Sequence, residues 1–143
     1  MSERFENPST EEIRALLSRI ETIAVVGLSP RHFRPSHRVA KALRHFGYRV
    51  IPVNPNTDQV FTSKSYPDLA SIPIPVDLVD VFRAPEHVSG IVDQCIALDL
   101  PALWLQDGVI DEASALRARA AGMTVVMDRC IYRDYLGFHP ESG

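Results

Sequence analysis

The sequence lacks several features that mark particular classes of protein. It has no excess of basic charge, because 15 lysines and arginines face 18 acidic residues and the formal net charge is −3. A general nucleic-acid-binding domain is usually basic. No apolar run approaches the roughly 18 residues of a membrane-spanning helix, and the N-terminus has no apolar stretch of the secretory type. We therefore expect a cytoplasmic protein with neither nucleic acid nor membrane as its partner.

The residues of common catalytic and metal sites are also sparse. Cys95 and Cys130 are the only cysteines, and their spacing matches neither a metal site nor a disulfide framework. The five histidines include no pair at ligand spacing on one expected helix. Ser29 lacks the Gly-x-Ser-x-Gly surroundings of a nucleophilic serine. The sequence therefore predicts no metal site and no catalytic residue.

The apolar residues that are present predict one α/β domain over residues 1–143. Five short apolar stretches alternate with helical patterns, and strands that are apolar on both faces are typical of a parallel sheet covered by helices. We expect a doubly wound, Rossmann-like domain with a five-stranded, mainly parallel sheet and helices on both faces. The expected strands are 22–27, 48–53, 77–82, 102–105 and 123–127. The expected helices are 9–20, about 36–46, 85–98 and 111–121.

The remaining segments are expected to be less regular. Residues 57–75 are rich in proline and are predicted to form an irregular connection, which either folds over a ligand or merely joins two strands. Residues 130–143 form an aromatic tail that is expected to pack on the outside, where it is able to cover an interface in a homo-oligomer. Ser9 and Glu12 have the spacing of a capping box at the start of the first helix.

The loop after the first expected strand concentrates positive charge. Residues 24–38 read AVVGLSPRHFRPSHR, in which Gly27 ends the strand and Arg31, Arg34 and Arg38 follow. We expect Ser36 to cap the next helix, whose first amides attract anions. Arginine also presents forked donors that suit phosphate oxygens. This pattern favours a phosphate-rich ligand, and the alternative is a solvated loop.

The dinucleotide fingerprint Gly-x-Gly-x-x-Gly is incomplete in this loop. Gly27 stands first, but Ser29 and His32 occupy the next two glycine positions. An NAD site also requires an acid near the end of the second strand, where this sequence has Asn54 and Pro55. Because no carboxylate is present at the end of the second strand, a ligand with an extra phosphate meets no repulsion at that point. NADP and coenzyme A both fit this description.

A series of short motifs resembles one known family. In order along residues 10–130, the chain resembles the small single-domain CoA-binding proteins of bacteria and archaea, which are similar to the CoA-binding N-terminal domain of the succinyl-CoA synthetase alpha subunit. The motifs are Gly27-x-Ser29, Arg34-Pro35-Ser36, Val53-Asn54-Pro55, Asp80-Val81-Phe82-Arg83, Trp104-Leu105-Gln106-x-Gly108 and Asp128-Arg129-Cys130.

The resemblance implies how CoA would bind. Its ADP half would cross the first two strand ends, with the pyrophosphate held at the first loop and the adenosine flanked by Asn54 and Pro55. Phe82 and Arg83 would line the path of the pantetheine arm or a phosphate. Gln106 would present its amide to the ligand or to the loop after Gly108. The complete set of expected cofactor-binding residues is Gly27, Ser29, Arg34, Ser36, His37, Asn54, Pro55, Phe82, Arg83 and Gln106.

The function that follows is non-covalent binding of CoA or an acyl-CoA by a module without catalytic machinery. Two alternatives stay open, an NADP-type oxidoreductase and a subunit of a split acyl-CoA synthetase that works with a partner chain. Cys130 either forms a mixed disulfide with the CoA thiol or is a buried small hydrophobe. Asp80 and Asp128, near strand ends, are expected to accept hydrogen bonds from loop amides.

Overall fold

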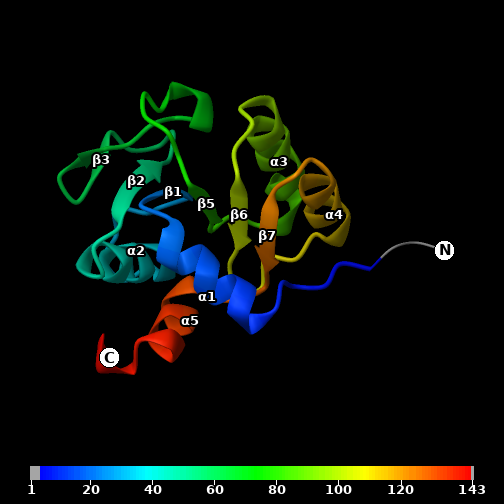
Figure 1. Cartoon of the computed structure of the whole chain (residues 1–143). Helices are drawn as coiled ribbons and strands as arrows, with labels where there is room; N and C mark the ends of the chain where they lie inside the picture. The colour runs from blue at the N-terminus through cyan, green and yellow to red at the C-terminus, as the bar shows by residue number, and fades with distance from the viewer. Residues whose placement is uncertain (1–3, 143) are drawn as a thin grey trace.

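A parallel five-stranded sheet forms the centre of the molecule (Figure 1). The computed structural model describes residues 4–142, so residues 1–3 and 143 of the expected domain lie outside the described part. The sheet order is β2-β1-β5-β6-β7, and every pairing between these strands is parallel. The strands are β1 (Thr22–Val26), β2 (Arg49–Val53), β5 (Leu78–Val81), β6 (Ala102–Leu105) and β7 (Thr124–Met127).

The order of the strands creates a switch point between β1 and β5. The chain passes from β1 to β2 at one edge and then returns to place β5 on the other side of β1. Connections on the two sides of β1 therefore run over opposite faces of the sheet. In open sheets of this kind, ligands bind beyond the carboxyl ends of the strands at this point. The topology thus directs attention to the residues that follow β1 and β5.

Helices cover both faces of the sheet, as predicted (Figure 1). The helices α1 (Thr10–Arg19), α2 (Pro35–His45) and α5 (Ile131–Phe138) pack on one face, and α3 (Val88–Ala97) and α4 (Glu112–Ala120) pack on the other. Side chains alternate along each strand, so Ile23 and Val25 face α1 and α2, whereas Ala24 and Val26 face the α3 side. No helix in residues 4–142 is long and apolar enough to cross a membrane.

Local sequence signals explain where several helices begin and end. The expected capping box is present, because the Ser9 hydroxyl accepts from the Glu12 amide at 3.2 Å and the Glu12 side chain returns to Ser9. Asp111 caps α4 by accepting from the Ser114 amide at 3.1 Å. Gly47 follows α2 with φ of +106°, a conformation that glycine adopts without a steric penalty.

Some expected elements differ in the structure. The segment 57–75 is not irregular throughout, because it forms the short hairpin of β3 (Gln59–Val60) and β4 (Ser63–Lys64) and a 3₁₀ turn at Leu69–Ser71. The tail contains the helix α5, whose first residue Ile131 is fully buried in the core. Helix α3 starts at Val88 after a 3₁₀ turn. The hairpin strands are only two residues long, and α3 and α5 have no side-chain cap. The sequence therefore carried no local signal for where these elements begin and end.

Candidate ligand-binding site

Two cavities open at the carboxyl edge of the sheet, on opposite faces. We call the larger one the α2 cavity: it has a volume of about 680 Å³ and is walled by the β1–α2 loop, the start of α2 and the ends of β5 and β6. The smaller one, the α3 cavity, measures about 270 Å³ and is walled by α3 and the end of β2. Neighbouring residues in the sequence line different cavities: Gly27 and Phe82 line the α2 cavity, whereas Val26 and Arg83 line the α3 cavity.

The structure brings most of the expected residues to these cavities, but divides them. Pro55 and Arg83 line the α3 cavity. Asn54 and His37 line neither. The α2 cavity is lined by Gly27, Ser29, Arg34, Ser36, Phe82 and Gln106. The expected set therefore follows one edge of the sheet and spans both of its faces.

The β1–α2 loop is held by its two serines. The Ser29 amide donates to the Ser36 hydroxyl oxygen at 3.0 Å, and the Arg31 amide donates to the Ser29 hydroxyl oxygen at 3.1 Å. Ser36 is buried inside α2, which begins at Pro35 with Arg34 as its N-cap residue. The prediction that Ser36 caps this helix is therefore wrong, because Pro35 supplies the favourable first helical position and Ser36 instead fixes the loop.

Positive charge at the mouth of the α2 cavity is not neutralised by the protein. Arg31 and Arg34 line the cavity, and among residues 4–142 neither guanidinium belongs to an ion pair. The N-terminus of α2, the positive end of an 11-residue helix, lies at the same place, although Pro35 has no N–H and the His37 amide donates to the Arg34 carbonyl at 3.1 Å. Together these groups form an attractive position for a phosphate.

Gly27 allows the ends of β1 and β5 to approach one another. Its φ is +86°, and an added Cβ would collide with the carbonyl oxygen of Phe82 and lie 2.9 Å from the Arg83 side chain. A larger residue would therefore push apart the two strands at the switch point. This contact within the protein is a reason for glycine that the sequence did not reveal.

Gln106 and Cys130 connect the α2 cavity to α5. The Gln106 side-chain oxygen accepts from the Ile131 amide at 3.2 Å, rather than from the loop after Gly108. Cys130 is the N-cap residue of α5, is half-buried and lines the cavity. Its side chain is thus part of the cavity wall, in contrast to Cys95, which is fully buried in the core.

Asn54 and His37 have structural contacts away from both cavities. The Asn54 amide donates to the Leu28 carbonyl at 3.0 Å, and its oxygen accepts from the Asn56 amide at 2.9 Å. Asn54 therefore ties the end of β2 to the chain after β1. The His37 ring packs against Phe61 in a tilted arrangement, with 4.7 Å between ring centroids. Burial, and to a lesser extent the charge of the nearby His32, lowers the pKa of the His37 imidazole.

The two aspartates near strand ends differ from one another. The Asp128 carboxylate accepts from the Gly108 amide at 2.7 Å, which confirms the prediction for that residue. For Asp80 the prediction of hydrogen bonds from loop amides is wrong, because this side chain is fully buried and neither of its oxygens has a hydrogen-bond partner. Burial raises the pKa of the Asp80 carboxyl well above its usual range. The strand extends to Val81, so Asp80 lies within it rather than in a loop.

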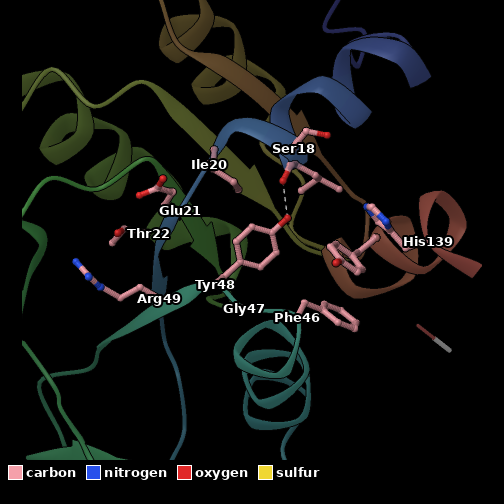
Figure 2. Close-up of a pocket in the computed structure, with 11 residues that line it drawn as sticks. Ser18, Ile20, Glu21, Thr22, Phe46, Gly47, Tyr48, Arg49 and His139 are labelled. Carbon is pink, nitrogen blue, oxygen red and sulfur yellow. Dashed lines mark hydrogen bonds between the residues drawn. The ribbon is translucent and has the colours of Figure 1, made fainter. Parts of the chain in front are cut away.

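A third cavity of about 720 Å³ lies at the opposite edge of the sheet (Figure 2). The first residues of β1 and β2 line it, together with Tyr48, whose hydroxyl donates to the Leu17 carbonyl at 2.5 Å. Burial raises the pKa of Tyr48 to about 12. This cavity is at the amino ends of the strands, where parallel α/β sheets do not usually bind ligands.

Comparison with known proteins identifies the family. Residues 21–135 match the CoA binding domain. The chain belongs to this CoA-binding family. The predicted resemblance is thereby confirmed, and so is the predicted fold, because the chain superposes on solved structures over almost its whole length.

Relatives of this chain include both small proteins and parts of larger ones. It is 42% identical to the uncharacterized protein YneT of Bacillus subtilis over 127 residues, which cover 89% of this chain and 94% of YneT. A hypothetical protein of Pyrococcus horikoshii matches with a TM-score of 0.88 and 32% identity over 94% of this chain and 95% of its own. The ADP-forming acetate–CoA ligase II of Archaeoglobus fulgidus is 29% identical over 77 residues, 52% of this chain and 11% of the ligase.

Proposed function

We propose that this protein binds coenzyme A or an acyl-CoA non-covalently at the carboxyl edge of its sheet, in the cytoplasm. The observation that carries the proposal is the pair of arginines, Arg31 and Arg34, that line the α2 cavity beside the N-terminus of α2 and take part in no ion pair within residues 4–142. Membership of the CoA-binding family supports the choice of ligand. The residues present fit such a ligand, because a phosphate group meets donors and positive charge there.

The cavity offers different surroundings to the two halves of the ligand. Arg34, Ser29 and Ser36 are proposed to hold the pyrophosphate, because they surround the start of α2. The uncharged pantetheine arm would lie on the apolar wall of Val39, Phe82 and Val109, which extends towards Cys130. Asn54 and Pro55 are proposed to flank the adenosine, and Arg83 to reach a phosphate from the α3 side.

A second candidate is a role as one subunit of a split acyl-CoA synthetase. It is favoured by the match to 11% of an ADP-forming acetate–CoA ligase. In that case a partner chain would supply the remaining domains, and CoA would still bind at the same edge. Binding of CoA by the isolated chain is therefore the first property to test.

Thermal melting of ligand-stripped protein tests the choice of ligand. CoA, dephospho-CoA, NAD and NADP are compared at equal concentration. A ligand at one hundred times its dissociation constant adds about 2.7 kcal/mol, which raises the melting temperature of a domain of this size by several degrees. We expect the largest rise with CoA and a smaller one with dephospho-CoA. A rise with NADP and none with CoA would favour the oxidoreductase instead.

Replacement of Arg34 tests the place of binding. Arg34→Gln removes one charged donor from the cavity, and we expect it to weaken CoA binding about ten- to a hundredfold in calorimetry, because a hydrogen bond to a charged group is worth about 1.5–3 kcal/mol. Arg49→Gln is the matched control, since this exposed arginine lines the cavity at the opposite edge. Equal affinities for Arg34→Gln and wild type would refute the proposed phosphate position.

A further inference from the structure

Positive charge is concentrated in one part of the chain. Residues 22–57 contain six lysines and arginines and no acidic residue, whereas the chain as a whole has a net charge of −3. All 18 acidic residues therefore lie elsewhere in the sequence. A charge distribution of this kind gives one surface of a molecule a potential whose sign is opposite to that of its net charge.

Much of this charge forms a row along one face of α2. The row begins at the N-cap residue Arg34, and Arg38, Lys41 and His45 follow at intervals of four, three and four residues. Side chains at these intervals lie on the same face of an α-helix. All four residues are exposed, whereas the opposite face of α2 is buried in the core. At a rise of about 1.5 Å per residue, the row is about 16 Å long.

The row starts at the α2 cavity and leads away from it. Arg34 lines the cavity, whereas Arg38 and Lys41 do not. Along the helix axis, Arg38 lies about 6 Å beyond Arg34 and Lys41 about 10 Å beyond it. Arg38 and Lys41 are therefore near the cavity without forming part of its wall.

The charges of Arg38 and Lys41 are not neutralised by the described part of the chain. Among residues 4–142, neither side chain belongs to an ion pair. Exposed charges contribute little to stability, but their field extends over about 10 Å at an ionic strength of 0.1 M. Arg34 and the cavity wall around it lie within about this distance, so an anion that approaches the cavity is attracted by both residues.

We propose that Arg38 and Lys41 steer the anionic ligand into the α2 cavity, so that it associates faster although neither residue touches it once it is bound. The inference rests on the proposed function, because the phosphate groups of CoA supply the negative charge. A field of complementary sign raises the association rate and has little effect on dissociation. Arg38 and Lys41 would therefore favour ligands in proportion to their negative charge, CoA more than dephospho-CoA.

Stopped-flow fluorescence with etheno-CoA, whose modified adenine is fluorescent, tests this assignment. We expect the double variant Arg38→Gln/Lys41→Gln to associate about three- to tenfold more slowly at an ionic strength of about 0.1 M, with an unchanged dissociation rate. The difference should disappear at about 1 M, where the field extends over only about 3 Å. It should also be smaller for the etheno form of dephospho-CoA, which carries fewer charges.

The double variant Arg19→Gln/Arg49→Gln is the matched control. It removes the same amount of charge from two exposed arginines at the opposite edge of the sheet, where α1 ends and β2 begins. We expect it to associate nearly as fast as wild type. All four substituted residues are exposed, so both variants should melt at the same temperature as wild type.

Each outcome supports or overturns the inference. An unchanged association rate in Arg38→Gln/Lys41→Gln at low ionic strength would overturn it, and so would an equal loss in the control, which would make net charge the cause. Faster dissociation without slower association would overturn it as well, because the residues would then contact the bound ligand. Calorimetry separates this inference from the proposed function: wild-type protein that does not bind CoA would refute both, whereas CoA binding at a rate independent of these charges would refute the steering alone.

Discussion

At the scale of single residues, the burial of Asp80 has a consequence for stability. An aspartate in an unfolded chain titrates near pH 3.9, and burial raises the pKa of Asp80 in the folded protein. Between these two values the folded state binds more protons than the unfolded state. Stability therefore falls as pH rises through this window, by up to about 1.4 kcal/mol per pH unit.

Asp80→Asn is expected to remove this pH dependence, because the amide is uncharged throughout. The free energy of unfolding of the variant should exceed that of wild type by an increasing amount as the pH is raised from 4 towards neutrality. Denaturant unfolding at several pH values measures the difference, and the other acids cancel because both proteins contain them. A difference that stays constant with pH would show that Asp80 is not protonated in the folded state.

Asp80 also shows what the sequence does and does not reveal about a residue. An acid inside a strand that is otherwise apolar on both faces was a visible signal of a buried charge, but its position near the strand end suggested a loop contact. Ser36 was misassigned for a similar reason, because its role depends on the fold of the loop before it. The position of Gly27 and Arg34 beside a cavity was easier to predict, because the loop after a strand of a parallel sheet lies at the carboxyl edge of that sheet.

At the scale of elements, α5 and the α2 cavity depend on one another through Gln106. Its side-chain oxygen accepts from the Ile131 amide at the start of α5, and the Trp104 indole donates to the Arg129 carbonyl just before it, at 2.8 Å. Further along the helix, Tyr135 stacks on Phe46 of the α2 end, with 3.9 Å between centroids. Helix α5 is therefore tied at its start to Gln106 beside the cavity and packs against the end of α2.

Gln106→Leu is expected to loosen α5 because it leaves the buried Ile131 amide without an acceptor. The loss should lower the free energy of unfolding by about 1–3 kcal/mol, and hydrogen exchange should accelerate in α5 more than in α3. Gln94→Leu provides a matched control, since the Gln94 oxygen accepts from the Leu69 amide on the other face. Equal protection of α5 in wild type and Gln106→Leu would contradict this role.

The sequence signal for α5 was present but weak. Ile131, Tyr135 and Phe138 have the spacing of residues on one face of a helix. The aromatic composition of the segment nevertheless favours a tail on the outside of the domain. Cys130 is not a residue that usually begins a helix, and the contacts that stabilise α5 come from β6 and α2. Helix α1, in contrast, was predicted correctly because its capping box lies entirely within its own sequence.

At the scale of the whole molecule, the strand order decides how the site is divided. Alternating strands and helices predicted the α/β class and the edge of the sheet at which the α2 and α3 cavities open. The order β2-β1-β5-β6-β7 depends on contacts between distant parts of the chain. It places Pro55 and Arg83 on the α3 face of the sheet, whereas Arg31 and Arg34 of the β1–α2 loop lie on the α2 face. A ligand that contacts all of the predicted residues must cross the sheet edge between Gly27 and Phe82.

Alkylation of Cys130 is the most direct test of whether CoA occupies the α2 cavity. Cys130 lines the cavity, whereas burial removes Cys95 from solvent and raises the pKa of its thiol to about 12. Intact mass after timed treatment with iodoacetamide therefore reports on Cys130, with Cys130→Ser as the control for any reaction at Cys95. We predict one rapid addition to the free protein and a clear slowing in saturating CoA. An unchanged rate at a CoA concentration that calorimetry shows to be saturating would place the ligand elsewhere and contradict the proposed site.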